Sequence, residues 1–270
     1  MRKALRFGKD FIKRFSEHDV VGLSAQLAYF FLLSIFPFMI FLVALMGYIP
    51  IPYDFQITLT RYMPEKALEL FNENLNTKSG GLLSVGLIGT IWSASNGINA
   101  IIKAFNRAYE VEEDRSFIKT RLIAIVLTVA MIIVIIVALL LPVFGKAIGL
   151  YIFSWFGVSD EFLAVWAALR WVVSSVIILF VLISLYILAP NRHVNVKQAF
   201  FGSLFATIAW QVASFSFSFY VNISAMTYSA TYGSLGGVII LMVWFYLTGM
   251  IIILGGEVNA MLKERKVFVS

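Results

Sequence analysis

Cysteine is absent from this sequence and histidine is scarce, so the side chains that most often hold metals or attack substrates are nearly missing. Without cysteine there is no disulfide, no thiolate nucleophile and no thiolate metal site. The two histidines, His18 and His193, lie in different polar segments and lack a ligand spacing such as H-x-x-x-H. We therefore expect no metal site and no cofactor.

Charge is also scarce. Only 13% of the 270 residues are charged and 60% are hydrophobic, whereas a soluble domain carries about 25% charged residues. Apolar runs recur along the chain with mostly short connections, which leaves little room for a separate soluble domain. Because a lipid-exposed backbone must satisfy its own hydrogen bonds, helices are the expected structure. The composition predicts an all-α polytopic membrane protein, with residues 1–270 forming one integral membrane domain.

The apolar runs predict six transmembrane helices. Their approximate ranges are 23–48, 82–102, 122–144, 171–189, 198–221 and 233–254. Residues 49–81 are expected to form an extracytoplasmic cap, and residues 145–169 an interfacial segment. The basic stretch from Arg2 to Phe15 has apolar residues at helical spacing, which is typical of an amphipathic helix on the membrane surface.

The basic residues are distributed unevenly over the two sides of this arrangement. Sixteen Lys and Arg residues lie on the side that holds both termini, and four lie on the other side, with Arg170 at the boundary of the fourth span. The positive-inside rule then places both termini in the cytoplasm of a multi-pass protein of the plasma or inner membrane. This bias accounts for the net charge of +6 without nucleic acid. The expected partner is the lipid bilayer, and the sequence leaves open whether the chain forms a homo-oligomer. The mixed charges of residues 103–121 are expected to be solvated.

Several expected spans carry a polar face. In the second span the polar positions fall within about 80° of arc at 100° per residue. In the fifth span the alternating sequence SFSFSFY suggests a strand, but its length suits a helix on which polar residues form one stripe. The first span contains Tyr29 and a helix-kinking Pro37. The two polar faces consist of Trp92, Asn96, Asn99, Lys103 and Asn106 in the second span, and of Ser203, Thr207, Gln211, Ser214, Ser218 and Asn222 in the fifth.

The sixth span ends at a single carboxylate, Glu257. A carboxylate at the carboxyl end of a helix is disfavoured by the helix dipole unless a cation compensates it, so we expect a basic neighbour, with Lys103 or Arg107 as the first candidates. At the other end of the span, Gly233 and Gly237 form a G-x-x-x-G step that favours close helix packing.

Four ordered blocks resemble the YihY/BrkB family. They are LAYFFLLSIFPFMI at 27–40, IWSASNGINAIIKAFNRAYEVEEDR at 91–115, LYILAP at 185–190, and TYGSLGG with WFYLTGMIIILGGEVNA at 231–260. The resemblance implies six transmembrane helices in the bacterial inner membrane and a transport role with no settled substrate. Family members often have Gly-Ala-Glu where this chain has Gly255-Gly256-Glu257.

The family has also been labelled ribonuclease BN. Hydrolysis of RNA needs a metal site or a positioned acid and base in an exposed cleft. Isolated histidines, the lack of thiols and a carboxylate cluster confined to a charge-mixed loop argue against that activity, so we expect no enzymatic function.

The favoured function is a transporter or solute-permeable pore for a neutral or anionic small solute, because no acidic residue lies in the middle of a span. The path would be lined by Asn96, Asn99, Gln211, Ser214 and Ser218, with Tyr29 and Trp92 as its walls. Glu257 and Lys103 would lie at the cytoplasmic mouth. Arg170 would either snorkel to the membrane interface or form an entrance to the path. In one alternative the polar stripes only hydrogen-bond helices together. In another the protein handles lipid or acts as a structural scaffold.

Overall fold

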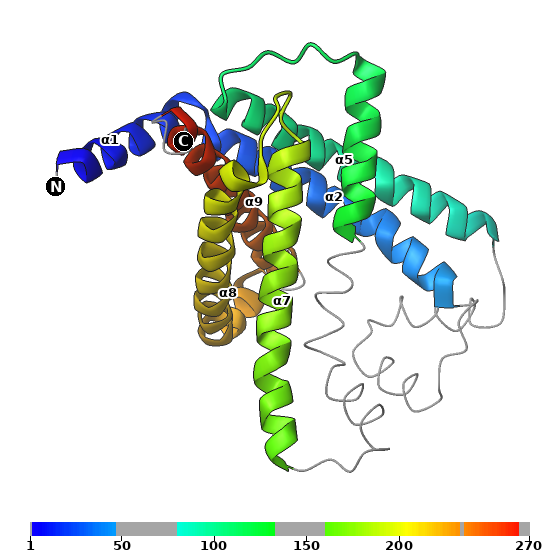
Figure 1. Cartoon of the computed structure of the whole chain (residues 1–270). Coiled ribbons are helices and arrows are strands. Elements are labelled where there is room, and N and C mark those ends of the chain that lie inside the picture. The colour runs from blue at the N-terminus through cyan, green and yellow to red at the C-terminus, as the bar shows by residue number, and fades with distance from the viewer. Residues whose placement is uncertain (1, 47–79, 133–159, 233–234, 265–270) are drawn as a thin grey trace.

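The computed structural model describes residues 2–46, 80–132, 160–232 and 235–264. All regular secondary structure in these residues is helical, which confirms the all-α class (Figure 1). The helices are α1 (Arg2–Glu17), α2 (Val20–Met46), α5 (Gly80–Ala108), a helix over residues 117–132, α7 (Asp160–Leu188), α8 (Val196–Tyr232) and α9 (Leu235–Glu264).

Four of the described helices are long and apolar enough to cross a membrane. They are Val20–Phe41, Gly80–Ala108, Val196–Val221 and Leu235–Glu264, and Val172–Leu188 is a shorter apolar helix. A membrane protein with several apolar helices is therefore confirmed. The helix over residues 117–132 contains the first part of the expected third span. The rest of that span and residues 49–79 of the expected cap lie outside the described residues, and residues 80 and 81 belong to α5.

Helix α7 begins earlier than the expected fourth span. Residues 160–169, which we expected in an interfacial segment, continue without interruption into the apolar helix that ends at Leu188. No glycine or proline occurs between Asp160 and Leu188, and Asp160 and Glu161 suit the first turn of a helix because of its dipole. The sequence therefore offers no break at Arg170. Residues 145–159 lie outside the described part of the chain.

The basic amphipathic stretch forms helix α1, as predicted. A tight turn at His18 and Asp19 joins it to α2, and Asp19 has a positive φ of 52°. The side chain of Asp19 then accepts a hydrogen bond from the backbone N–H of Gly22 at 3.2 Å, which caps the first turn of α2. This turn allows α1 to fold across one end of the bundle.

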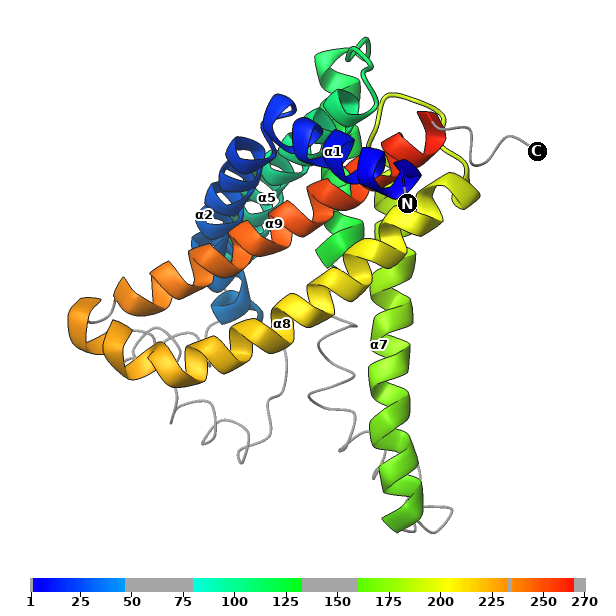
Figure 2. The same cartoon turned by 90° about the vertical axis from the view of Figure 1, so that its left-hand side faces the viewer.

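Helix α9 lies between α2 and α8 (Figure 2) and also contacts α5. Glycines on α9 allow these close approaches, since a Cβ atom at each would collide with a neighbour. At Gly249 it would lie 2.6 Å from Leu27, and at Gly256 it would lie 2.7 Å from the ring of Phe105. At Gly255 it would overlap the Tyr186 hydroxyl and approach the carbonyl of Gly202.

Polar groups buried at the same crossing are hydrogen-bonded across the helices. The backbone N–H of Gly202 donates to Asn259 Oδ1 at 2.6 Å, and Asn259 Nδ2 donates to the carbonyl of Ala199 at 3.2 Å. The hydroxyl of Tyr186 donates to the carbonyl of Ile252 at 2.8 Å. In an apolar environment these bonds avoid the cost of unsatisfied polar groups.

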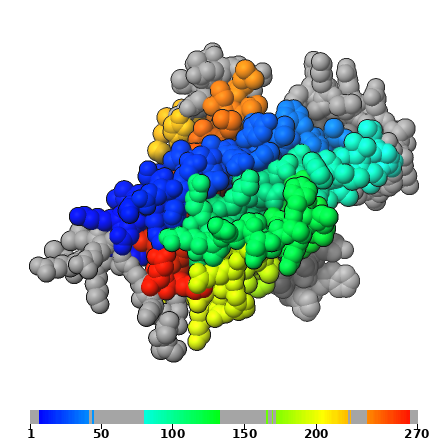
Figure 3. All heavy atoms as spheres, turned by 90° about the horizontal axis from the view of Figure 1, so that it is seen from above, coloured from blue at the N-terminus to red at the C-terminus, as the bar shows by residue number. Residues whose placement is uncertain are grey.

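Helices α2 and α5 run alongside each other (Figure 3) and form the most extensive helix pair in the described residues. Glycines of α5 again permit the contact: Gly86 lies against the backbone of Phe41, and Gly89 against Pro37. Pro37 therefore lies inside α2 at a packed position. By contrast, no atom of the described residues lies within 4 Å of a Cβ atom built on Gly237, and Gly233 is not among those residues.

We expect Gly255→Ala to destabilise the protein, because its methyl group would collide with Tyr186 and Gly202. Overpacking of this kind costs about 1–3 kcal/mol, more than the roughly 1 kcal/mol that alanine gains over glycine in a helix. Thermal unfolding of the purified protein in detergent measures the effect. Gly237→Ala, on the same helix but in open space, is the control and should be neutral or slightly stabilising. Equal unfolding temperatures for the two variants would contradict this packing.

Candidate functional site

The carboxylate of Glu257 is buried at the end of α9 that α1 covers, with 1% of the residue exposed. Its Oε1 lies 2.6 Å from Nδ1 of His18, and its Oε2 lies 3.6 Å from Nη1 of Arg14. Arg14 belongs to α1, and His18 lies in the turn that directly follows α1. The basic neighbour predicted for Glu257 is therefore present, but Lys103 and Arg107 were the wrong candidates.

Arg107 takes part indirectly. Its Nη1 donates to the backbone carbonyl of His18 at 3.1 Å, so it holds the turn that carries the histidine. The sequence could not reveal this arrangement, because it depends on α1 folding back over residues more than two hundred positions away.

Arg14 joins three elements. It donates to the carbonyl of Ala108, the last residue of α5, at 3.0 Å, and it also bonds Glu264 on α9 and Glu110 just beyond α5. A cation at the carboxyl end of a helix is favoured by the dipole. Burial opposes the charge of Arg14, but the surrounding carboxylates of Glu264, Glu257 and Glu110 outweigh it and raise the pKa of the guanidinium. Arg14 therefore stays charged and fastens α1 to the end of the bundle.

A pocket of about 230 Å³ opens beside this cluster. All but one of the side chains that line it are ionisable. They are Asp10, Lys13, Arg14, Glu17, His18, Glu110, Met261 and Glu264. We call Arg14, His18 and Glu257 the α1–α9 cluster. It combines a buried acid, an imidazole and a guanidinium next to a polar cavity, and so it can exchange protons or bind a small polar solute or ion.

Helix α5 ends in a Schellman motif at Glu110, which has a positive φ of 53°. The N–H of Val111 bonds the carbonyl of Asn106, and the N–H of Glu110 bonds the carbonyl of Arg107. Glycine usually occupies this position, and none occurs between Gly97 and Gly145, so no glycine marks the end of the helix in the sequence. The turn aims the Glu110 side chain at Arg14.

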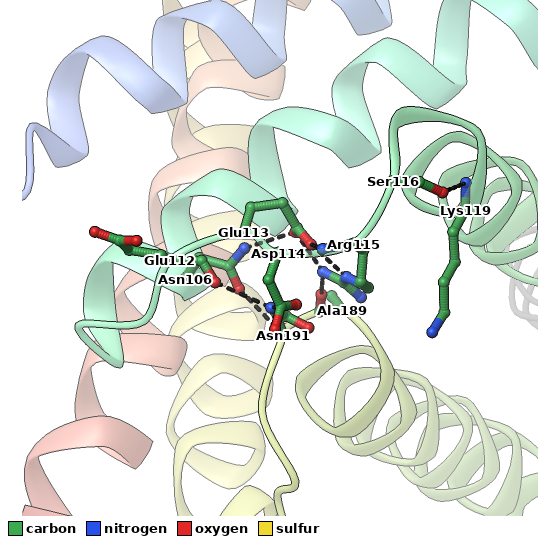
Figure 4. A network of polar contacts seen from close by, with 9 residues as sticks. All are labelled: Asn106, Glu112, Glu113, Asp114, Arg115, Ser116, Lys119, Ala189 and Asn191. Atoms are coloured by element: carbon green, nitrogen blue, oxygen red, sulfur yellow. Dashed lines mark hydrogen bonds and ion pairs between the residues drawn. The ribbon is translucent and has the colours of Figure 1, made fainter.

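The loop after α5 is held by a polar network (Figure 4) and is more ordered than the solvated charge run that we expected. Glu113 accepts from Asn106 Nδ2 at 2.8 Å and twice from the Arg115 guanidinium at 2.6 Å. Arg115 also donates to the carbonyl of Ala189 at 3.1 Å, and the N–H of Asn191 donates to Asn106 Oδ1 at 2.7 Å. The end of α5 is thus tied to the turn between α7 and α8.

The predicted polar face of α5 meets a cation from the next helix. Nη1 of Arg121 donates to Asn96 Oδ1 at 2.6 Å, Nη2 donates to the carbonyl of Trp92 at 3.2 Å, and the guanidinium lies 4.0 Å from the centre of the Trp92 ring. The buried Oδ1 of Asn99 has no hydrogen-bond partner among the described residues. Lys103 lines a second, open pocket of about 660 Å³ between α5 and the α1–α2 turn.

The polar stripe of α8 has different partners. Gln211 Nε2 donates to Ser175 Oγ of α7 at 2.7 Å. Ser203, Thr207 and Ser214 donate to carbonyls of their own helix, four residues back. Ser218 is exposed, and so is Tyr29 on α2. Arg170 lies within α7, and its side chain is outside the described part of the structure.

Among the described residues, no hydrogen bond therefore joins the predicted lining residues of α5 to those of α8. Three site residues were missed by the sequence analysis: Arg14, His18 and Arg121. Arg14 was indistinguishable from its basic neighbours on an amphipathic helix, and His18 was an isolated histidine. Arg121 did carry a signal, since it directly precedes an apolar run.

The loop network gives a pH-dependent prediction. The Arg115 guanidinium beside Glu113 holds the pKa of that carboxyl below its usual 4.5. Because the folded-state pKa is lower than the unfolded one, the stabilisation is present above about pH 4.5 and is lost as the pH falls through the folded value. Glu113→Gln should cost about 1 kcal/mol at pH 7, reduced from the usual charged hydrogen bond by partial exposure. The unfolding temperature of Glu113→Gln should therefore lie below that of wild type by more at pH 7 than at pH 4. An equal difference at the two pH values would contradict the ion pair between Glu113 and Arg115.

Comparison with known proteins agrees with the membrane architecture. The Virulence factor BrkB family matches residues 11–269. A Bacillus subtilis (strain 168) protein, YfkH, whose name describes it as ribonuclease-like, is 51% identical over 267 residues and 97% of each chain. A UPF0761 membrane protein of Vibrio parahaemolyticus is 29% identical over 96% of this chain and 83% of its own length. No solved structure matches. The chain therefore belongs to the BrkB family of membrane proteins.

Proposed function

We propose that this protein transports a small neutral or anionic solute across the bacterial cytoplasmic membrane, and that the α1–α9 cluster lies at its cytoplasmic entrance. In this proposal the chain crosses the membrane six times with both termini in the cytoplasm. The uneven distribution of Lys and Arg supports the orientation.

The observation that carries the proposal is the burial of Glu257 at the end of an apolar helix. Removing a carboxylate from water is costly even when it is paired, and replacing such a pair with apolar residues is often neutral or stabilising. Charged groups within membrane helices are correspondingly rare and usually serve a solute or proton path. Glu257 is 1% exposed and touches a pocket-lining arginine and histidine, which is the arrangement expected of a working site.

The path beyond this entrance would be lined by Asn96, Asn99, Gln211, Ser214 and Ser218, with Tyr29 and Trp92 as walls. Support comes from Asn99, whose buried oxygen has no partner among the described residues, and from the exposure of Tyr29, Trp92 and Ser218. One observation supports the alternative, a lipid-handling or scaffold protein. The hydroxyls of Ser203, Thr207 and Ser214 donate to carbonyls of α8 itself, so these side chains need no solute as a hydrogen-bond partner.

The test is solute flux through the full-length protein in liposomes of phosphatidylethanolamine and phosphatidylglycerol. Swelling after an osmotic shock, followed by light scattering, reports entry of a neutral polyol or a small carboxylate. We expect wild type to admit at least one of these solutes faster than protein-free liposomes. Glu257→Gln should lower that flux, because it removes the negative charge that holds Arg14 and His18 at the proposed entrance.

Asp114→Asn is the matched control, because it removes an exposed carboxylate of the loop after α5 that lines neither pocket. Its flux should stay within about twofold of wild type, since exposed charges contribute only about 0–1 kcal/mol. If Glu257→Gln does not fold, His18→Gln tests the same contact. Wild-type liposomes that admit neither solute would favour the scaffold alternative, and unchanged flux in the Glu257 variant would remove the cluster from the path.

We further propose that the protein is not an enzyme, despite the ribonuclease-like name of its relative. Among the described residues, no group of three or more His, Cys, Asp or Glu side chains is placed to hold a metal ion. Purified protein incubated with a fluorescent RNA and Mg²⁺ or Mn²⁺ should cleave it no faster than buffer does. Cleavage that disappears in Glu257→Gln would overturn this proposal and assign the cluster to catalysis.

A further inference from the structure

We propose that Arg121, which lies on the helix over residues 117–132 and is held against α5, binds an anionic oxygen group, either a carboxylate or a phosphate. The site goes beyond the proposed transport path, because it needs no flux to exist. A solute or a lipid headgroup could present the group.

The first argument is the geometry of the guanidinium. It has five N–H donors, and the structure uses two of them, one to Asn96 and one to the Trp92 carbonyl. Three are left over: one hydrogen on each terminal nitrogen and the Nε–H, which is buried without a hydrogen-bond partner among the described residues. The Trp92 ring lies against the group at 4.0 Å and fixes its plane. The donors are therefore held in place before any ligand arrives.

The second argument is charge. Arg14 and Arg115 each bond carboxylates, but no ion pair joins Arg121 to an acidic side chain within the described residues. Its hydrogen-bond partners there are an amide oxygen and a backbone carbonyl. These neutral groups orient the cation and do not neutralise it, so a negative charge is what this site lacks.

The third argument is position. Asn96 lies twelve residues before Ala108, the end of α5, which is about 18 Å along the helix. Leu122 and Val126, on the same helix as Arg121, are 57% and 64% exposed, and their side chains suit lipid. An unneutralised cation beside such a surface is costly and points to a solute path or a lipid contact.

The chemistry of arginine selects the ligand class. Its planar fork matches the two oxygens of a carboxylate or phosphate, and it is less strongly hydrated than an ammonium group. A neutral solute would gain one or two hydrogen bonds but would leave the charge uncompensated. The competing explanation is that Arg121 only fastens two helices together, in which case no anion should stabilise the protein through it.

The experiment measures thermal unfolding of the full-length protein with added anions. In uncharged detergent, sodium acetate or sodium phosphate is titrated at constant ionic strength, with sodium chloride as balance. In nanodiscs, phosphatidylglycerol is compared with phosphatidylcholine. We expect at least one anion to raise the unfolding temperature of wild type. A shift with the soluble anions identifies a solute-type site, and a shift only with phosphatidylglycerol identifies a headgroup site.

Arg121→Gln should abolish this shift, and Arg121→Lys, which keeps the charge but not the fork, should weaken apparent binding by about tenfold or more. Lys119→Gln is the matched control, since it removes an equal positive charge two residues before Arg121. The Lys119 side chain is exposed, and no hydrogen bond or ion pair of the described residues joins it to α5. This variant should keep the shift.

Three outcomes would overturn the proposal: no anion stabilises wild type, the shift survives in Arg121→Gln, or Lys119→Gln loses it equally. Arg121→Lys preserves the cation and serves as the folding-competent variant if Arg121→Gln does not fold; an unchanged shift in Arg121→Lys and in Trp92→Phe would then count against the site. Because binding is measured without a solute gradient, a failure of transport leaves these results intact.

Discussion

The contact on which this structure depends is the approach of four helices to α9 at positions that have no side chain. Gly249, Gly255 and Gly256 bring α9 against Leu27, Tyr186 and Phe105 at distances that a methyl group would not allow. In lipid, helices gain little from hydrophobic burial against one another, so close van der Waals packing and interhelical hydrogen bonds must hold them together. The bonds from Asn259 and Tyr186 at the same crossing supply the second part of that requirement.

The charged cluster depends on this packing. Because Phe105 packs on Gly256, the end of α5 lies beside α9, and with α1 folded over this end Glu257 is buried. Arg14 then has the carbonyl of Ala108 and three carboxylates within reach. A buried acid of this kind stabilises the fold little and often destabilises it, so its presence is better explained by function than by stability.

Much of the architecture was predictable because it follows from short-range patterns. Apolar runs and helical spacing indicated the helices, including α1 and the SFSFSFY stretch within α8. The charged end of α9 also indicated a basic neighbour. The identity of that basic neighbour could not be predicted, because it depends on two separate turns. In these turns Asp19 and Glu110 adopt left-handed backbone conformations that non-glycine residues seldom adopt. The sequence also indicated a polar face on α5, but the cation that bonds it, Arg121, lies on a helix whose direction the sequence does not specify.

The order of residues 255 to 257 has a mechanical consequence. Successive residues of a helix point about 100° apart, and here Gly255 meets α7 and α8, Gly256 meets α5, and Glu257 meets α1. Helix α9 therefore contacts four different helices within a single turn. A rotation of α9 about its own axis would alter all four contacts at once.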